Sequence, residues 1–183
     1  MNKIVDLLEG TDFIINRPAK IYVTITAPRK ADVKIEGEFA DVLSASFDFV
    51  VGLIAKSGLN PIVYTETIRD RGETFFSLHS SIDKNVLKAA VGNTMLYDVD
   101  ENSNINFRAT GCAYGYVLGV ISMVDYIVKY YDLDYDEYIE FFFDAYNNWI
   151  SSDKRKDLLA GKYDKKYVKS CREVSFYILR FAS

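Results

Sequence analysis

The chain has 183 residues, of which 49% are hydrophobic and 15% aromatic. This length is typical of one domain, and the apolar content excludes an intrinsically disordered chain because it is sufficient for a hydrophobic core. The net charge of −4 is divided unevenly, since residues 153–183 carry nine Lys and Arg against four Asp and Glu, which leaves −9 on residues 1–152. We predict one domain over residues 1–183 that ends in a basic segment, 153–183.

The opening sequence, MNKIVDLLEGTDF, contains acidic side chains and no sustained apolar core, so we expect no secretory leader. The longest apolar run, residues 111–131, has only 16 uncharged residues between Arg108 and Asp125. A membrane-spanning helix needs roughly 18 to 20. We therefore expect a cytoplasmic protein without a membrane segment.

Apolar and polar residues alternate over residues 21–26 and again over 32–36, which predicts a β-hairpin. Residues 38–57 have apolar side chains at helical spacing and predict a buried helix. Residues 62–68 and 74–79 are rich in β-branched and aromatic side chains, and we predict a strand for each.

A short helix over residues 82–91, capped by Ser80 or Ser81, is predicted next, followed by paired strands at 95–98 and 105–108. Residues 111–131 predict a second buried helix. Its glycines recur every four residues, which places them on one helix face and predicts a close approach by the helix at 38–57, by the sheet or by a second copy of the chain. These glycines are Gly111, Gly115 and Gly119.

The fold class predicted is α+β: a mostly antiparallel sheet of short strands with two buried core helices, 38–57 and 111–131. Strand, turn, strand and helix occur in this order in residues 20–57 and again in 94–131. This order suggests a duplicated ββα unit, although chance similarity of pattern explains it as well. A further helix is predicted over residues 135–150, and the segment 165–181 fits a strand or a helix equally.

Acidic residues from Asp132 onward resemble a calcium-binding loop at first sight. That loop requires Gly at its sixth position and Glu at its twelfth, where this chain has Glu137 and Phe143. Asp134 with Glu137 three residues later instead predicts a helix cap. We expect no metal ion and no cofactor.

His79 is the only histidine, and Arg69 and Arg71 precede it in the chain. An imidazole beside two guanidinium groups could act as an acid or base on a bound phosphate, so these three residues are the candidates for a metal-independent ribonuclease-like activity. No linear catalytic motif supports this activity. We therefore favour a protein that is not an enzyme and keep this reading as the alternative.

The basic C-terminal segment has tyrosines between its charges, a pattern that suits contact with RNA or DNA, although a solvated surface explains it equally. Its candidate nucleic-acid-binding residues are Lys154, Arg155, Lys156, Lys162, Lys165, Lys166, Lys169 and Arg172.

The segment from Tyr130 to Trp149 combines acidic residues with more large aromatic rings than one buried stripe accommodates. Exposed aromatic side chains anchor protein interfaces, and acidic neighbours suit a partner with a basic surface. Core packing beneath a solvated acidic face is the other interpretation. The candidate partner-binding residues are Asp132, Asp134, Asp136, Glu137, Glu140, Asp144, Tyr138 and Trp149.

The hairpin IYVTITAPRKADVKIEGEF, the helix ADVLSASFDFVVGLIAKSG and the acidic DLDYDEYIEFFFDAYNNW together are similar in character to small accessory proteins of phages and mobile elements of low-GC bacteria. These proteins include anti-CRISPR inhibitors. The resemblance implies a protein of the host bacterial cytoplasm that acts as a nucleic-acid mimic, its acidic face occupying the nucleic-acid site of an effector such as a CRISPR nuclease. The glycine face leaves a third alternative, a structural protein that associates with itself.

Overall fold

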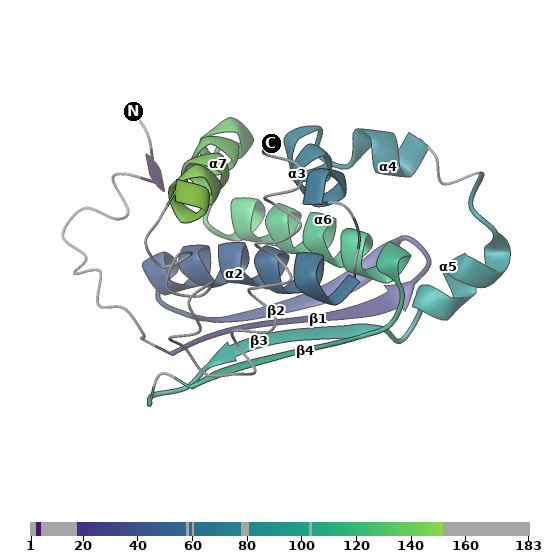
Figure 1. Cartoon of the computed structure of the whole chain (residues 1–183), viewed down its shortest axis with the longest axis horizontal. Helices are drawn as coiled ribbons and strands as arrows, with labels where there is room; N and C mark the ends of the chain where they lie inside the picture. Colours follow the sequence, from purple (N-terminus) through teal and green to yellow (C-terminus); the bar gives the residue numbers. More distant parts are fainter. Residues whose placement is uncertain are drawn as a thin grey trace.

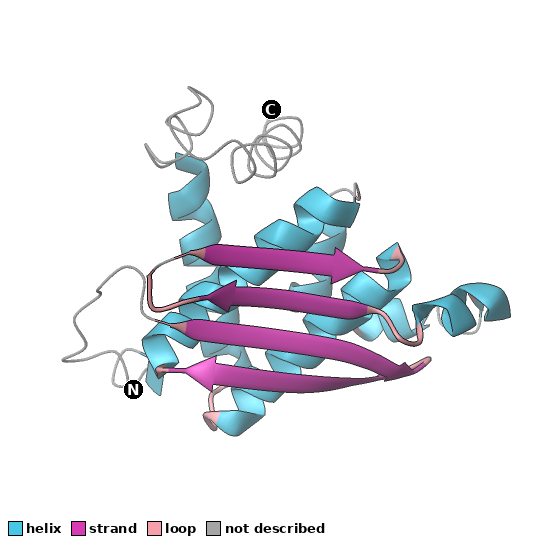
Figure 2. Ribbon diagram, turned by 90° about the horizontal axis from the view of Figure 1, so that it is seen from below, coloured by secondary structure: helices cyan, strands magenta, loops and turns pink. Residues whose placement is uncertain are grey.

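The computed structural model of the chain describes residues 3–4, 18–57, 59, 61–77, 81–102 and 104–151. A four-stranded antiparallel sheet forms one layer, and the helices pack against one of its two faces (Figure 1 and Figure 2). Its strands are β1 (Ala19–Ala27), β2 (Lys30–Gly37), β3 (Thr94–Val99) and β4 (Ile105–Thr110). The helices are α2 (Phe39–Ser57), α3 (Pro61–Arg69), α4 (Glu73–Ser77), α5 (Lys84–Ala90), α6 (Ala113–Tyr130) and α7 (Tyr135–Ser151). The α+β fold of a single domain is as predicted.

The strand order is β2-β1-β3-β4, so the two hairpins meet through their first strands. In the central pair, Ile21 lies opposite Tyr97 and Val23 lies opposite Met95. All four side chains are buried beneath the helices. The period-two pattern predicted both hairpins because one face of each strand is covered and the other faces outward.

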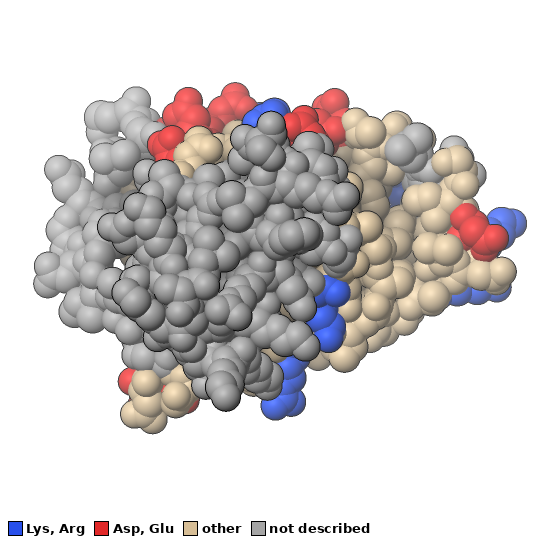
Figure 3. Space-filling view, viewed as in Figure 1, with Lys and Arg blue, Asp and Glu red and all other residues tan. Residues whose placement is uncertain are grey.

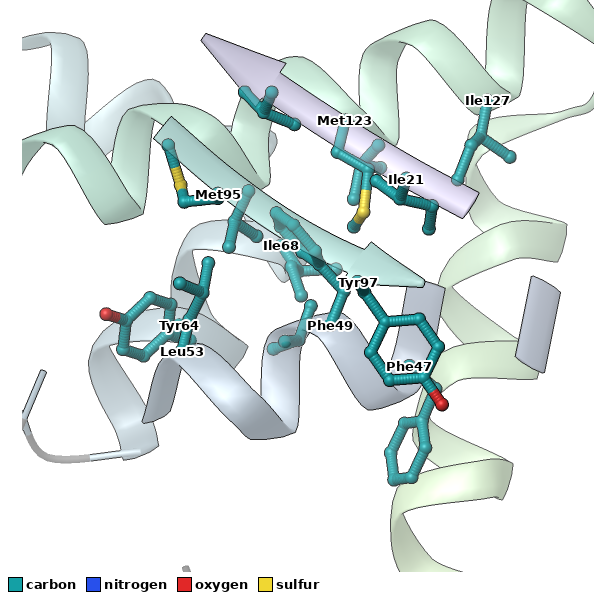
Figure 4. Close-up of a cluster of buried hydrophobic side chains, with 14 of the residues drawn as sticks. Ile21, Phe47, Phe49, Leu53, Tyr64, Ile68, Met95, Tyr97, Met123 and Ile127 are labelled. Carbon is teal, nitrogen blue, oxygen red and sulfur yellow. The ribbon is translucent and has the colours of Figure 1, made fainter. Parts of the chain in front are cut away.

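The two core helices, α2 and α6, lie side by side between the sheet and the outer helices (Figure 1). Residues from all three elements form the buried cluster: Figure 4 shows Ile21 and Met95 of the sheet, Phe49 and Leu53 of α2, and Met123 of α6. None of the helices in the described ranges has both the length and the hydropathy that crossing a membrane requires.

The glycines of α6 face the beginning of β3. A Cβ at Gly115 would overlap the Asn93 side chain, and a Cβ at Gly119 would lie 2.5 Å from Met95 Sδ. Asn93 is itself buried, and its Oδ1 accepts a hydrogen bond from the backbone N–H of Cys112 at the start of α6 (2.9 Å). The close approach predicted from the glycines is therefore to the sheet for Gly115 and Gly119, whereas Gly111 lies before the start of α6 with a φ of 136° and not on the helix face. Because Gly115 and Gly119 are buried within the chain, they provide no contact surface for a second copy.

The predicted strands at 62–68 and 74–79 are wrong, since residues 62–68 belong to α3 and residues 74–77 to α4; residues 78–79 lie outside the described part. Pro61 occupies the first position of α3, where its missing N–H is no loss. Tyr64 and Ile68, four residues apart, are the buried side chains that attach α3 to the core. Tertiary packing has overridden the β propensity of the segment.

Helix α5 is capped by Asp83 and not by the predicted Ser80 or Ser81. The Asp83 carboxylate accepts a hydrogen bond from the Asn85 N–H at 2.6 Å.

Candidate protein-binding surface

Helix α7 is attached to the core through aromatic side chains. Tyr138 and Phe142 are both almost completely buried, and the Tyr138 hydroxyl donates a hydrogen bond to Ser46 Oγ of α2 (3.1 Å). Burial raises the pKa of Tyr138 to about 12. Tyr138 was predicted to contact a partner, but it lies in the core and is not available at the surface.

The loop before α7 is fixed by three of the predicted acidic residues. Asp134 caps the helix, since its Oδ1 accepts hydrogen bonds from the N–H groups of Asp136 (2.8 Å) and Glu137 (3.2 Å). Lys3 pairs with Asp132 at 2.8 Å, and this hydrogen bond lowers the pKa of the Asp132 carboxyl. The Lys3 N–H also donates to the Glu137 carboxylate (3.0 Å). The predicted cap is confirmed, and these residues have structural roles.

Arg71 connects the turn after α3 to α7. Its Nη2 lies 3.0 Å from Asp136 Oδ1, and its guanidinium carbon lies 4.5 Å from the centre of the Tyr135 ring. The half-buried Asp125 of α6 is close by, and its pKa is raised by burial and lowered in part by Lys129 and Arg71. Arg71 therefore interacts with carboxylates and an aromatic ring of its own chain.

Arg69 is held in the same way. Its Nη1 lies 2.7 Å from Glu66 Oε1, and its guanidinium carbon lies 4.5 Å from the centre of the Phe143 ring of α7. The proposed catalytic corner combined Arg69 and Arg71 with His79. His79 lies outside the described residues, and the two arginines bind carboxylates rather than converging on an open phosphate site.

Two exposed acidic residues of α7 differ from the other predicted acids in that their carboxylates have no partner in the described part of the chain. The carboxylates of Glu140 and Asp144, one helical turn apart, make no hydrogen bond or ion pair with the described part of the chain. In Figure 3, Asp and Glu side chains gather along the upper edge of the molecule, over α7 and α3. We call the exposed carboxylates of this region the acidic face, which consists of Asp132, Asp134, Asp136, Glu140 and Asp144. Trp149 lies within α7, but its side chain lies outside the described part.

An exposed aromatic ring lies at the end of α6, whereas the aromatic side chains of α7 within the described part are buried or half-buried. Tyr130 is 66% exposed, and its ring stacks on that of Tyr126 with centroids 5.7 Å apart and an interplanar angle of 13°. Tyr131 contacts both Tyr130 and Phe39 of α2 edge to face. Tyr126, Tyr130 and Tyr131 form what we call the tyrosine cluster, which continues directly into Asp132 of the acidic face. Tyr126 was not among the predicted partner-binding residues, although its four-residue spacing from Tyr130 places the two rings on one face of the helix.

The other possible functional sites of the chain have less support. Within the described ranges, no group of His, Cys, Asp and Glu side chains could hold a metal ion. The Asp100 carboxylate, for example, accepts hydrogen bonds from Asn102 and Asn104 of its own turn. On the uncovered face of the sheet, a shallow depression of about 300 Å³ is lined by Lys20, Tyr22, Lys34, Glu36 and Leu96. The basic segment 153–183 lies outside the described residues.

Comparison with known proteins gives no match to a family model, to a curated protein or to a solved structure. The surface of the chain is therefore the basis on which its function is inferred. Its most distinctive feature is a series of exposed carboxylates on a well-anchored helix, preceded in the chain by the exposed Tyr130, whose ring stacks on the half-buried Tyr126.

Proposed function

We propose that the chain is a binding protein that carries out no reaction itself and engages a basic surface of another protein through its acidic face and tyrosine cluster. The observation that carries the proposal is the exposure of Glu140 and Asp144 on successive turns of α7, without a cation partner in the described part of the chain. Complementary charge accelerates association and selects the partner, while exposed tyrosines supply contact area at low entropic cost.

The rigidity of α7 supports this role. Tyr138 and Phe142 anchor the helix in the core, and Arg71 and Arg69 hold its outer side through Asp136 and the Phe143 ring. Carboxylates on a helix fixed in this way need little reorganisation on binding, which preserves affinity.

The partner that we propose is a protein whose basic surface normally holds a nucleic acid. A spaced series of carboxylates imitates a phosphate backbone, which is the expectation for an inhibitor of a nucleic-acid-guided nuclease in a bacterial host. The competing proposal of an RNA-cleaving protein receives less support because Arg69 and Arg71 are already paired with carboxylates.

The proposal can be tested by capture and displacement. The immobilised full chain is incubated with a nuclease-treated bacterial lysate, so that basic surfaces are free of nucleic acid, and the captured protein is identified and purified. We expect a nucleic-acid-binding protein that a single-stranded oligonucleotide displaces. Capture of a protein that binds no nucleic acid, or that the oligonucleotide fails to displace, would contradict the proposed partner class.

A further inference from the structure

The two outermost strands of the sheet, β2 and β4, differ in how their free edges are protected (Figure 2). β2 has a charged side chain at every second position, and its pairing with β1 shifts register between Ile25 and Ala27. Charged side chains and β-bulges discourage the addition of another strand to an edge. β4, with the sequence INFRAT, has one charged residue, Arg108. The charged residues of β2 are Lys30, Asp32, Lys34 and Glu36.

The register of β3 and β4 determines which backbone groups of β4 face the open edge. The Asp100 N–H donates a hydrogen bond to the Asn104 carbonyl (3.1 Å) at the turn end of this hairpin. Hydrogen-bonded and non-hydrogen-bonded pairs alternate in an antiparallel ladder, so the even-numbered residues of β4 bond to β3. The N–H and C=O groups of the odd-numbered residues therefore point away from β3. We call these the edge residues: Ile105, Phe107 and Ala109.

The edge residues combine unpaired backbone groups with a firm attachment to the core. Their outward N–H and C=O groups have no hydrogen-bond partner among the described residues. Phe107 packs edge to face on Phe49 of α2, with ring centroids 6.5 Å apart, and its ring fills the space above Gly52. Ile105 lies on the same side of the strand but remains 42% exposed. A further strand would bond to these groups and cover Ile105.

The other side of β4 carries a positive charge that lacks a counterion in the described part of the chain. Arg108 is exposed, and its Nε–H donates a hydrogen bond to Asn106 Oδ1 at 3.2 Å. It makes no ion pair with a described residue, and the residue opposite it on β3 is Leu96. Opposite charges on neighbouring strands stabilise a sheet. An acidic side chain on an added strand would supply the missing partner.

We propose that the β4 edge binds an extended segment of another protein, which adds as a fifth, antiparallel strand. The backbone groups of the edge residues bond to the segment, a mode of recognition that main-chain hydrogen bonds make strong and alternate side chains make selective. On the side of the helices the segment presents apolar side chains, which cover Ile105. On the other side it presents an acidic residue, which pairs with Arg108. This site is separate from the acidic face and does not depend on the proposed function.

A model peptide tests the site directly. The full chain, labelled with ¹⁵N, is titrated by NMR with a blocked peptide in which Val alternates with Thr and one central Thr is replaced by Glu. We expect the amide signals of the edge residues to shift and their exchange with solvent to slow at least about tenfold at saturation. Shifts confined to other parts of the chain, or no shift at millimolar peptide, would overturn the site.

Backbone methylation of the peptide tests the pairing itself. In an antiparallel pair, the peptide residues that bond to the edge residues also share their side of the sheet, so they are the valines. Methylation of the Val amides should weaken binding at least about tenfold, because several hydrogen bonds are lost. Methylation of the Thr and Glu amides, which face solvent, should change the affinity less than about twofold. Equal weakening by the two patterns, or the reverse order, would contradict strand addition.

A charge exchange tests the acidic position. Arg108→Glu should bind the Glu peptide about fivefold more weakly and should prefer a matched peptide with Lys in place of Glu. Lys34→Glu makes the same charge change on the exposed side of β2 and should leave both affinities within about twofold of the wild type. Unchanged affinities in Arg108→Glu, or equal changes in both variants, would overturn the pairing of the segment with Arg108.

Hydrogen exchange of the chain alone tests whether the edge is free for another protein. The amides of the edge residues should exchange faster than those of Asn106 and Arg108, which bond to β3. Protection of the edge residues at every protein concentration would show that the chain covers its own edge. Protection that increases with concentration would show that a second copy covers it. Either result would overturn the proposal.

Discussion

The Asn93 side chain occupies the space in which Gly115 would carry a Cβ atom. Two hydrogen bonds fix Asn93 there, from its Nδ2 to the Ala89 carbonyl (3.0 Å) and from the Cys112 N–H to its Oδ1 (2.9 Å). The contact joins the start of β3 to the start of α6, and it accounts for a glycine within a buried helix.

Gly115→Ala should destabilise the protein more than Gly119→Ala does. At position 115 the added methyl meets a fixed amide, and overpacking of about 1–3 kcal/mol outweighs the roughly 1 kcal/mol gain in helix propensity. At position 119 the methyl meets the flexible end of Met95, which can turn away. Urea unfolding of both variants measures the difference. A Gly115→Ala variant at least as stable as Gly119→Ala would contradict this account.

The pair Arg71 and Asp136 should contribute to the attachment of α7. A double-mutant cycle with Arg71→Met and Asp136→Asn should give a coupling free energy of about 0.2–1 kcal/mol, because both side chains are largely exposed. Since salt screens exposed pairs, the coupling should shrink at about 1 M NaCl. A coupling of zero at low salt would show that the pair does not attach the helix.

Asp125 and Asp132 should affect the pH dependence of stability in opposite directions. Burial raises the pKa of Asp125 above its ordinary 3.8, so the folded state holds its proton more tightly and stability falls as pH rises through this region. Asp125→Asn should therefore be more stable relative to wild type at pH 7 than at pH 3. Lys3 lowers the pKa of Asp132, so the stability contributed by that carboxylate is present at neutral pH and lost as pH falls.

Asp132→Asn should accordingly lose stability at pH 7 and approach wild type as pH falls toward 3. Asn tolerates the positive φ of 51° at this position, so the backbone remains unstrained. Denaturant unfolding of both variants across this range provides the measurement. If the stability of both variants relative to wild type changed in the same direction between pH 7 and pH 3, the environments assigned to Asp125 and Asp132 would be contradicted.

Tyr138 should make the protein sensitive to alkali. Its pKa of about 12 exceeds the ordinary 10.0, so above pH 10 the unfolded chain releases a proton that the folded chain retains, and stability falls as pH rises. Tyr138→Phe should lose about 0.5–1.5 kcal/mol at pH 7 with the hydrogen bond to Ser46. Between pH 10 and 11, the free energy of unfolding of Tyr138→Phe should fall less than that of the wild type. A parallel decline in the two proteins would argue against burial of this hydroxyl.

The sequence predicted the sheet and the two core helices because each has a clear period. β1 and β2 alternate at every second residue, whereas α2 and α6 are apolar over enough turns to define a buried helix. The strand predicted for the residues of α3 was wrong because IVYTETI is rich in β-branched side chains, which favour strands. Only the fold shows that Tyr64 and Ile68 share a buried helix face.

The surface was predicted less well than the fold. The acidic residues of α7 were identified, but a helix with aromatic residues on several sides does not reveal which ones face the core. Tyr138 proved to be buried and Tyr130 exposed. The Asp134 cap was predicted from the local sequence, whereas Arg71 reaches Asp136 across 65 positions of sequence, which no local pattern contains.

The most direct test of a partner-binding acidic face is the dissociation constant of the captured partner for two double charge reversals. Glu140→Lys with Asp144→Lys alters α7 without disturbing the Asp134 cap, whereas Asp32→Lys with Glu36→Lys makes the same charge change on β2, on the uncovered face of the sheet. The account predicts at least about tenfold weaker binding and a smaller salt dependence for the α7 pair, with the β2 pair close to wild type. Wild-type affinity for the α7 pair, or equal weakening by both pairs, would contradict it.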